Sequence, residues 1–143
     1  MKHTVRIEID APREEVAALF ADPTNGEKWM EDTDYAPLSG TPGTVGSRYR
    51  LAQRDGSLTF TATVVARDLP DRVVLNLESD KVDVVVTATF ASLAPTKTQL
   101  TSEEVFRFHG VAGMVMGLLA RPAIAKAHRR QMESFKRFAE RAG

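Results

Sequence analysis

Five consecutive segments in which apolar and polar residues alternate constrain this chain more than any other feature. They are Ser47 to Gln53, Leu58 to Ala66, Arg72 to Glu78, Val82 to Phe90 and Thr98 to Phe108. Period-two alternation predicts strands with one buried and one solvated face. The breaks between the segments are short and turn-like, so neighbouring strands are expected to pair antiparallel as a meander. The acidic and Gly- and Pro-containing stretch before them, residues 31 to 46, predicts solvent-exposed turns.

The first thirty residues predict one further strand and two short helices. Apolar residues occupy alternate positions from Val5 to Asp10, which predicts a strand. Pro12 then begins a stretch with early acidic residues, which predicts a helix as far as Asp22. Thr24 to Met30 predicts another helical turn or two, with Trp29 as a packing anchor more than a ligand platform.

The end of the chain predicts a long helix that covers the sheet. The periodicity is helical from Gly110 to Ala142, and Pro122 is expected to bend or restart the helix. One face of its second half carries Ile124, His128, Met132, Phe135 and Ala139. Because a single sheet cannot bury its apolar face alone, the helix must lie across the sheet and the sheet must curl around it. The predicted fold class is α+β, a single helix-grip domain over residues 1–143 with a curved antiparallel β-sheet around a long C-terminal α-helix.

The opening of the chain resembles a known superfamily. The residues that carry the likeness are Val5-Arg6-Ile7-Glu8-Ile9-Asp10-Ala11-Pro12-Arg13-Glu14-Glu15-Val16, Asp22-Pro23 followed by Trp29, Val45-Gly46-Ser47 and the closing helix. The chain is similar over essentially its whole length to the START-like or SRPBCC superfamily, in particular its polyketide cyclase and dehydrase-like branch. This resemblance implies a deep cavity between the sheet and the C-terminal helix, in which relatives hold lipids, polyketides, hormones or other apolar molecules. Because catalytic residues vary widely among those relatives, none is carried over.

We predict ligand contacts from residues on the faces expected to line such a cavity. These are Tyr49, Leu51, Phe60, Leu75, Phe90, Phe106, Val115, Leu118 and His128. The hydroxyl group of Tyr49 suits a ligand pocket, and it equally suits a tyrosine at the edge of a core.

Two polar residues on apolar faces are candidates for catalysis. Glu104 shares a strand face with Leu100, Ser102 and Phe106 by alternation, and His128 lies on the apolar stripe of the closing helix. In an apolar cavity these two side chains could act as a general acid and base. The competing interpretation is that Glu104 lies at the open end of its strand and His128 is a hydrogen-bonded histidine of the core.

Several other functions are not favoured by the composition. The chain has no cysteine, which excludes disulfides and thiolate metal sites, and its three histidines show no metal-ligand spacing, so we predict no metal and no cofactor. The Gly40-x-x-Gly43-x-x-Gly46 pattern precedes a strand and predicts turns more than a nucleotide loop. From residue 121 onward there are seven basic and two acidic residues, which could approach nucleic acid or an anionic membrane but which we interpret as a solvated face.

The apolar run Val111 to Ala120 is too short to span a membrane and is expected to be buried in some other way. Its flexible methionines and its glycines suggest a mobile lid or the contact of a homodimer. No stable membrane insertion is predicted, and the absence of an apolar leader points to the cytoplasm.

Three functions remain open: a carrier or sensor of a small hydrophobic molecule, a polyketide cyclase or dehydrase-type enzyme that uses the same cavity, and a protein-binding module marked by an exposed apolar patch at Val111 to Leu119.

Overall fold

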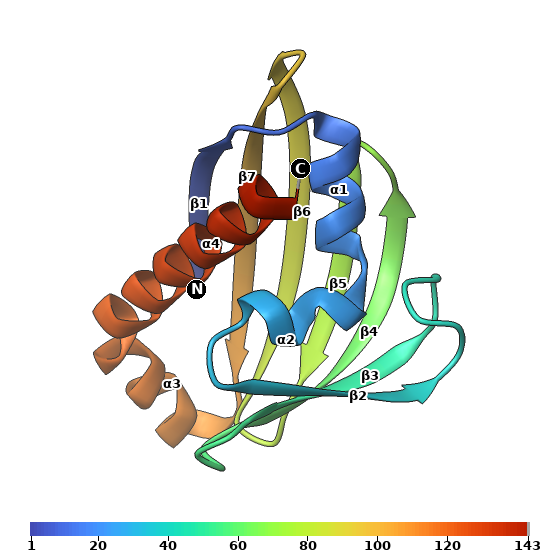
Figure 1. Cartoon of the computed structure of the whole chain (residues 1–143). Helices are drawn as coiled ribbons and strands as arrows, with labels where there is room; N and C mark the ends of the chain where they lie inside the picture. Colours follow the sequence, from blue (N-terminus) through green and yellow to red (C-terminus); the bar gives the residue numbers. More distant parts are fainter. Residues whose placement is uncertain (143) are drawn as a thin grey trace.

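The computed structural model describes residues 1–142, and its elements follow the predicted order of strand, short helices, meander and closing helices (Figure 1). The strands are β1 (Lys2–Ile9), β2 (Thr33–Ser39), β3 (Arg48–Gln53), β4 (Thr59–Asp68), β5 (Arg72–Glu78), β6 (Val82–Ala94) and β7 (Lys97–Phe108). The helices are α1 (Arg13–Ala21), the 3₁₀ turn η1 (Pro23–Asn25), α2 (Gly26–Trp29), α3 (Gly110–Leu119) and α4 (Arg121–Ala142).

All of these strands form one antiparallel sheet in the order β1-β7-β6-β5-β4-β3-β2. From β2 to β7 each strand pairs with the next one in the chain, which confirms the predicted meander. The first strand, β1, pairs with the last, β7. Figure 1 shows α1, α2 and α4 together over one face of the sheet. The predicted α+β helix-grip architecture is therefore confirmed.

Strand β2 is a correction to the sequence analysis, which placed only turns between residues 31 and 46. It pairs with β3 at the edge of the sheet, and its register shifts between Pro37 and Ser39. Proline cannot donate a ladder hydrogen bond and is confined to edge strands and bulges. Because β2 lies at an edge and most of its side chains are solvated, its residues lack the alternation that identified the other strands.

A cluster of aromatic side chains joins the short helices to α4 at one end of the sheet. The ring of Phe135 lies 5.2 Å from Phe20 and 5.1 Å from Trp29, measured between centroids. Phe20 also packs edge-on against Phe90 of β6, at 5.8 Å. Trp29 is almost fully buried and packs in this cluster, as expected of a packing anchor.

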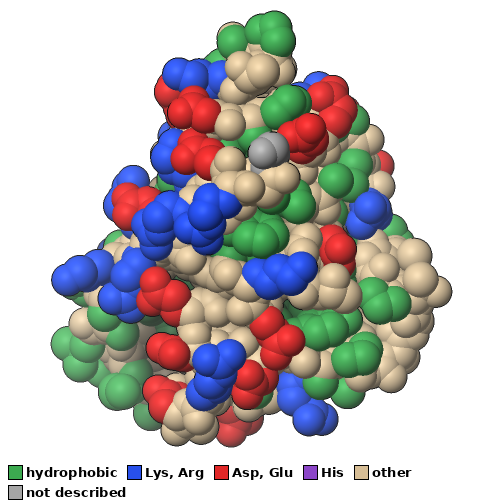
Figure 2. All heavy atoms as spheres, in the orientation of Figure 1, with side chains coloured by type: hydrophobic (Ala, Val, Ile, Leu, Met, Phe, Trp, Pro, Cys, Tyr) green, Lys and Arg blue, Asp and Glu red, His purple; other side chains and the backbone are tan. Residues whose placement is uncertain are grey.

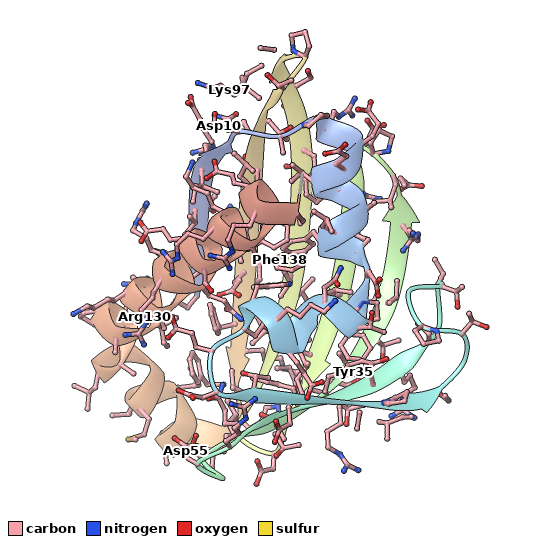
Figure 3. All side chains as sticks on the ribbon, viewed as in Figure 1. Asp10, Tyr35, Asp55, Lys97, Arg130 and Phe138 are labelled. Carbon is pink, nitrogen blue, oxygen red and sulfur yellow. The ribbon has the colours of Figure 1, made fainter. Side chains whose placement is uncertain are left out.

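Helix α4 buries the predicted stripe and exposes its charges. His128, Met132, Phe135 and Ala139 are all buried, at the spacing of one helical face. In Figure 3 the labelled Arg130 lies on the outer side of the helix, whereas Phe138 lies on the side toward α1. The helix is therefore docked through one face only.

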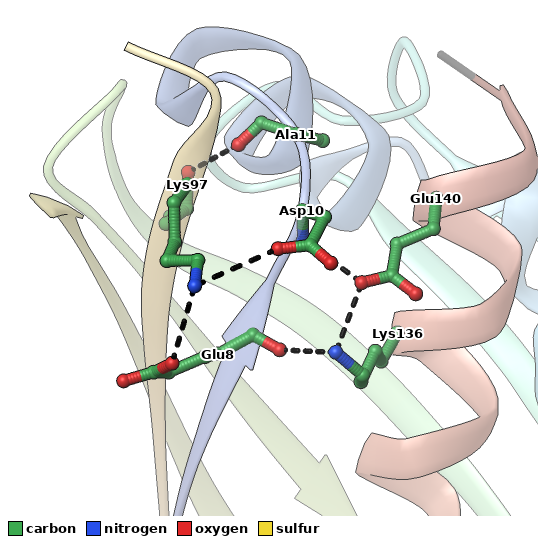
Figure 4. Close-up of polar contacts among 7 residues, drawn as sticks. Glu8, Asp10, Ala11, Lys97, Lys136 and Glu140 are labelled. Atoms are coloured by element: carbon green, nitrogen blue, oxygen red, sulfur yellow. Dashed lines mark hydrogen bonds and ion pairs between the residues drawn. The ribbon is translucent and has the colours of Figure 1, made fainter. Parts of the chain in front are cut away.

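Polar contacts attach the C-terminal half of α4 to β1 (Figure 4). The Lys136 ammonium group donates to the carbonyl oxygen of Glu8 at 2.6 Å, and the Glu140 carboxylate accepts from the backbone N–H of Asp10 at 2.8 Å. Lys136 and Glu140 also pair with each other at 2.9 Å. These contacts hold the helix in register with the first strand.

Helix α3 differs from the expectation of a buried apolar segment. The chain bends by 68° between α3 and α4, next to Pro122, which confirms the predicted break. The side chains of Val111, Met114, Val115, Met116, Leu118 and Leu119 are each half or more exposed. The prediction that these side chains are buried was wrong, because α3 turns away from the sheet face that α4 covers.

Within residues 1–142 no single helix is long and apolar enough to cross a membrane, although α3 and α4 taken together as a bent pair meet that criterion of length and composition.

Candidate functional site

A cavity of about 380 Å³ lies between α4, α2 and the concave face of the sheet. Its walls come from strands β3 to β7, from the turn of η1 and α2, and from the first half of α4. Most of the lining is aliphatic or aromatic, and it includes Trp29, Met30, Leu51, Phe60, Leu75, Leu77, Val84, Val86, Phe106, Phe108, Ile124 and Met132. The cavity is thus an apolar space bounded on one side by a helix and on the other by a sheet.

Most residues predicted to contact a ligand are in this lining. They are Tyr49, Leu51, Phe60, Leu75, Phe106 and His128, together with the catalytic candidate Glu104. Alternation along β7 explains the position of Glu104, because Ser102, Glu104 and Phe106 all face the cavity. Burial raises the pKa of the Tyr49 phenol, so this side chain stays neutral.

Three predicted residues lie elsewhere. Phe90 faces the same side of the sheet as the lining residues of β6, but it packs against Phe20 in the aromatic cluster under α1 and is not part of the lining. Val115 and Leu118 lie on α3, with exposed fractions of 50% and 66%, and neither reaches the lining. The sequence of α3 is apolar on nearly every side of the helix. It therefore could not predict which side faces solvent.

A buried polar cluster centred on His128 forms part of the cavity wall. The Nε2 atom of His128 lies 2.9 Å from Ser102 Oγ, and its Nδ1 atom lies 2.8 Å from His3 Nδ1. The same Nδ1 atom is 3.4 Å from Glu104 Oε1. Ser102 and His128 are buried, and the Glu104 side chain is only 15% exposed. The structure thus brings Glu104 and His128 together at one point of the cavity wall.

His3 is the member of this cluster that sequence reasoning missed. It comes from β1, where it pairs directly with Glu104 of β7. Cross-strand partners project from the same face of a sheet, so His3 and Glu104 are neighbours. His3 could have been found only by knowing that the first strand pairs with the last. The alternation within either strand does not reveal that pairing.

Burial favours the uncharged forms of Glu104 and His128 in this cluster. Desolvation raises the pKa of Glu104 to about 7, because a carboxylate is poorly solvated in an apolar wall. Desolvation, with a further contribution from the nearby His3, lowers the pKa of His128 to about 4. At pH values below 7, Glu104 is therefore largely a carboxylic acid and His128 a neutral imidazole. Their 3.4 Å approach is therefore a contact between two uncharged groups and not an ion pair.

The arrangement can donate and accept one proton at the cavity surface. With the proton on Nε2, His128 donates to Ser102 Oγ and its Nδ1 accepts from His3 Nδ1, while the Glu104 carboxyl group lies 3.4 Å from the same Nδ1 atom. With the proton on Nδ1, these roles reverse. A carboxyl group with a pKa near 7 is suited both to donating a hydrogen bond and to general acid–base catalysis.

The part of the chain described by the structure holds no group of three or more His, Cys, Asp or Glu side chains with the geometry of a metal site. The lining residues within that part also include no lysine or arginine. The acidic side chains of the lining are Asp22, next to η1, and Glu104 of β7.

Solved structures with the same fold come from several bacteria. A protein of Thermus thermophilus superposes with a TM-score of 0.83 at 13% identity, covering 100% of this chain and 99% of the other. A protein of Arthrobacter aurescens gives 0.74 at 18% identity, covering 98% and 86%. DynU16, a protein in the dynemicin biosynthetic locus, gives 0.72 at 18% identity and covers 97% of this chain but 47% of its own. At these identities the likeness shows the fold alone.

No curated protein sequence matches this chain. Residues 1–140 match a family model described as polyketide cyclase / dehydrase and lipid transport. The match covers β1 with its following helix, the whole meander and nearly all of α4, which are the elements that build the cavity. The chain therefore belongs to the polyketide cyclase/dehydrase and lipid transport family.

Proposed function

We propose that the protein binds one small, uncharged and mainly apolar molecule in the cavity, and that Glu104 and His128 hold a single oxygen atom of that molecule. The observation that carries this proposal is an apolar cavity with one neutral polar cluster in its wall. The family description, which joins polyketide chemistry with lipid transport, supports a lipid or polyketide-like ligand.

The size and the lining of the cavity favour such a ligand. Its volume of about 380 Å³ falls within the range of roughly 300 to 1,000 Å³ that is usual for small-molecule sites. Apolar ligand surface removed from water contributes roughly 25 cal/mol per Å², and part of this is offset by the loss of ligand and side-chain freedom. We therefore expect dissociation constants in the micromolar range or weaker.

The charge of the lining favours an uncharged ligand. A ligand carboxylate or phosphate in the cavity would be buried beside Glu104 with no lysine or arginine of the described chain in the lining. Burial of a charge without a partner is strongly unfavourable. A carbonyl oxygen, in contrast, accepts a hydrogen bond from the protonated Glu104 carboxyl group at no such cost.

Native mass spectrometry of freshly purified protein tests the proposal directly. A retained small molecule identifies the ligand class, and we expect its mass to correspond to a neutral apolar compound. Recovery of a nucleotide, a metal ion or an anionic metabolite in its place contradicts the proposal.

A pair of variants tests the location of the site. Phe106→Arg places a charged side chain in the lining, whereas Leu118→Arg places the same side chain on the exposed surface of α3. An environment-sensitive dye should lose its fluorescence enhancement with Phe106→Arg and keep it with Leu118→Arg. Thermal unfolding of both variants controls for misfolding, and dye binding that survives in a folded Phe106→Arg protein excludes this cavity.

The role of Glu104 is tested by comparing a long-chain ketone with the carboxylate of equal length in dye-displacement assays. We expect the ketone to bind more tightly, and its affinity to fall as the pH rises through about 7, because Glu104 then ionises and stops donating. Glu104→Gln keeps an amide donor and should remove this pH dependence. A preference for the carboxylate contradicts the assignment.

A cyclase or dehydrase-type enzyme is the second candidate, and it is favoured by the 3.4 Å approach of Glu104 to His128 inside the apolar wall. In that case Glu104 and His128 transfer a proton to or from the bound molecule. Either Glu104→Gln or His128→Gln should then lower turnover of the retained molecule about 100-fold or more while leaving its binding largely intact. For a carrier, His128→Gln should change affinity or stability by only about 1 kcal/mol, the usual net contribution of a hydrogen bond.

A further inference from the structure

We propose that α3 and the basic side chains at the start of α4 dock the protein on an anionic lipid surface. No residue of α3 lines the ligand cavity, so this docking surface is independent of the proposed function. It concerns the exposed segment that the sequence analysis expected to be buried.

Helix α3 presents apolar side chains over a wide arc. Val115 and Met116 are adjacent in sequence, as are Leu118 and Leu119, and adjacent helical residues project about 100° apart. All four are at least half exposed, and α3 contains no charged residue. A groove on a protein needs only a narrow apolar stripe, whereas immersion in the acyl region of a lipid interface favours a broad one.

The length of α3 fits a helix that lies in the interface. Its ten residues span about 15 Å, roughly half the thickness of a hydrocarbon core. The side of α3 that faces the protein is made of glycine. A Cβ atom on Gly117 would lie 2.5 Å from the Phe108 ring, so glycine permits the close approach that holds α3 against β7. The remaining sides are left free for a partner.

Basic side chains border this apolar surface. Arg121, Lys126 and Arg129 are exposed on the first half of α4, and within residues 1–142 none of them forms an ion pair. Figure 2 shows hydrophobic side chains gathered at the lower left, over α3, with Lys and Arg side chains immediately above them along α4. An apolar helix flanked by cations is the combination that binds anionic lipid headgroups.

The charge distribution distinguishes a lipid surface from a second copy of this chain. A symmetric pairing through α3 brings together two copies of the same surface, so the unpaired arginines and lysine gain no opposite charge from the same residues of the second copy. An anionic bilayer instead attracts all three side chains at once. Charge complementarity therefore favours lipid as the occupant of this face.

Cosedimentation with vesicles tests the proposal. We expect binding to vesicles of phosphatidylcholine containing about one quarter phosphatidylglycerol, and much weaker binding to phosphatidylcholine alone. Each basic side chain near an anionic surface contributes about fivefold to partitioning, so Lys126→Gln combined with Arg129→Gln should weaken binding about 25-fold. Leu118→Ser combined with Leu119→Ser should weaken it about tenfold or more through lost apolar contact.

Matched variants control for total charge and apolar surface. Arg137→Gln with Arg141→Gln removes the same charge from the other end of α4, and Val65→Ser with Leu93→Ser removes exposed apolar side chains from the sheet. Both controls should bind anionic vesicles as the unmodified protein does. The proposal is overturned if the protein ignores anionic vesicles at low salt, or if control and test variants lose binding equally. It is also overturned if sedimentation shows a stable dimer that the Leu118→Ser and Leu119→Ser changes dissociate, because α3 is then covered by a second copy.

Discussion

Helices α3 and α4 follow one another in the chain and have opposite relations between composition and burial. Helix α3 contains no charged residue and is mostly exposed, whereas α4 carries seven basic and two acidic residues and contributes Phe135, one of the most buried side chains of the core. The difference lies in the arrangement of apolar residues. Those of α4 form one stripe that matches the sheet, and those of α3 point in many directions. Apolar content alone therefore does not predict which helix is buried.

The largest expected effect comes from truncating one buried and one exposed apolar side chain. Phe135→Ala should lower the free energy of unfolding by about 3 to 5 kcal/mol, because it leaves a cavity among Phe20 and Trp29. Leu119→Ala, at a side chain 76% exposed, should change it by no more than about 0.5 kcal/mol. Urea denaturation of both variants measures the contrast. A large loss with Leu119→Ala would show that α3 is covered in solution.

A second test concerns the glycines on the inner side of α3. Gly117→Ala brings a methyl group onto the Phe108 ring and should destabilise the protein by about 1 to 3 kcal/mol. Gly113→Ala is the matched control, because its nearest neighbours lie at 3.7 Å, an ordinary contact distance. That change should stabilise the helix by up to about 1 kcal/mol through propensity. Equal behaviour of the two variants would mean that α3 does not rest on Phe108.

The third prediction compares the pH dependence of stability in variants of His128, on the buried face of α4, and of its neighbour Glu104. Glu104→Gln removes the carboxyl group and keeps His128, whose lowered pKa of about 4 means that the folded state binds fewer protons at this residue than the unfolded one. Stability should then fall as the pH drops from about 6.5 to about 4. In His128→Gln the raised pKa of Glu104, about 7, has the opposite effect, and stability should fall as the pH rises from about 4.5 to about 7.

Each of these trends should amount to at most about 3 kcal/mol, and in the unmodified protein they oppose one another over most of the same range. Urea denaturation at several pH values provides the measurement. Two variants with the same slope would show that the pair is not buried as described.

The smallest effect is expected at the start of α3. His109 Nε2 lies 3.0 Å from the Asp83 carboxylate, and its Nδ1 contacts the carbonyl oxygen of Asp80. The hydrogen bond to Asp83 raises the pKa of His109, while the nearby Arg107 acts in the opposite direction. The stabilising contribution is thus complete below the ordinary histidine value of 6.5 and is lost as the pH rises through the folded-state value. Hydrogen exchange in the first turn of α3, corrected for intrinsic rates, should therefore lose protection as the pH rises above about 6.5. His109→Gln should show no such change.

Much of the fold could be predicted because its strands and α4 carry clear periodicity. Alternation placed Glu104 and Phe106 on the inner face, and helical spacing placed His128 on the inner side of α4. Periodicity assigns a face but not a position along a strand relative to a helix, which is why Phe90 was placed in the cavity instead of the core under α1. His3 required knowledge of a pairing between distant strands.

That pairing of β1 with β7 also constrains how the chain can assemble during synthesis. Strands β2 to β7 pair with sequence neighbours and can form one hairpin after another as they leave the ribosome. The first strand emerges earliest, yet Val5 finds its partner Ser102 only after all the other strands have appeared. Until β7 has been synthesised, β1 has no partner strand. We expect the pairing of β1 with β7, which closes the largest loop of the chain, to limit the rate of folding.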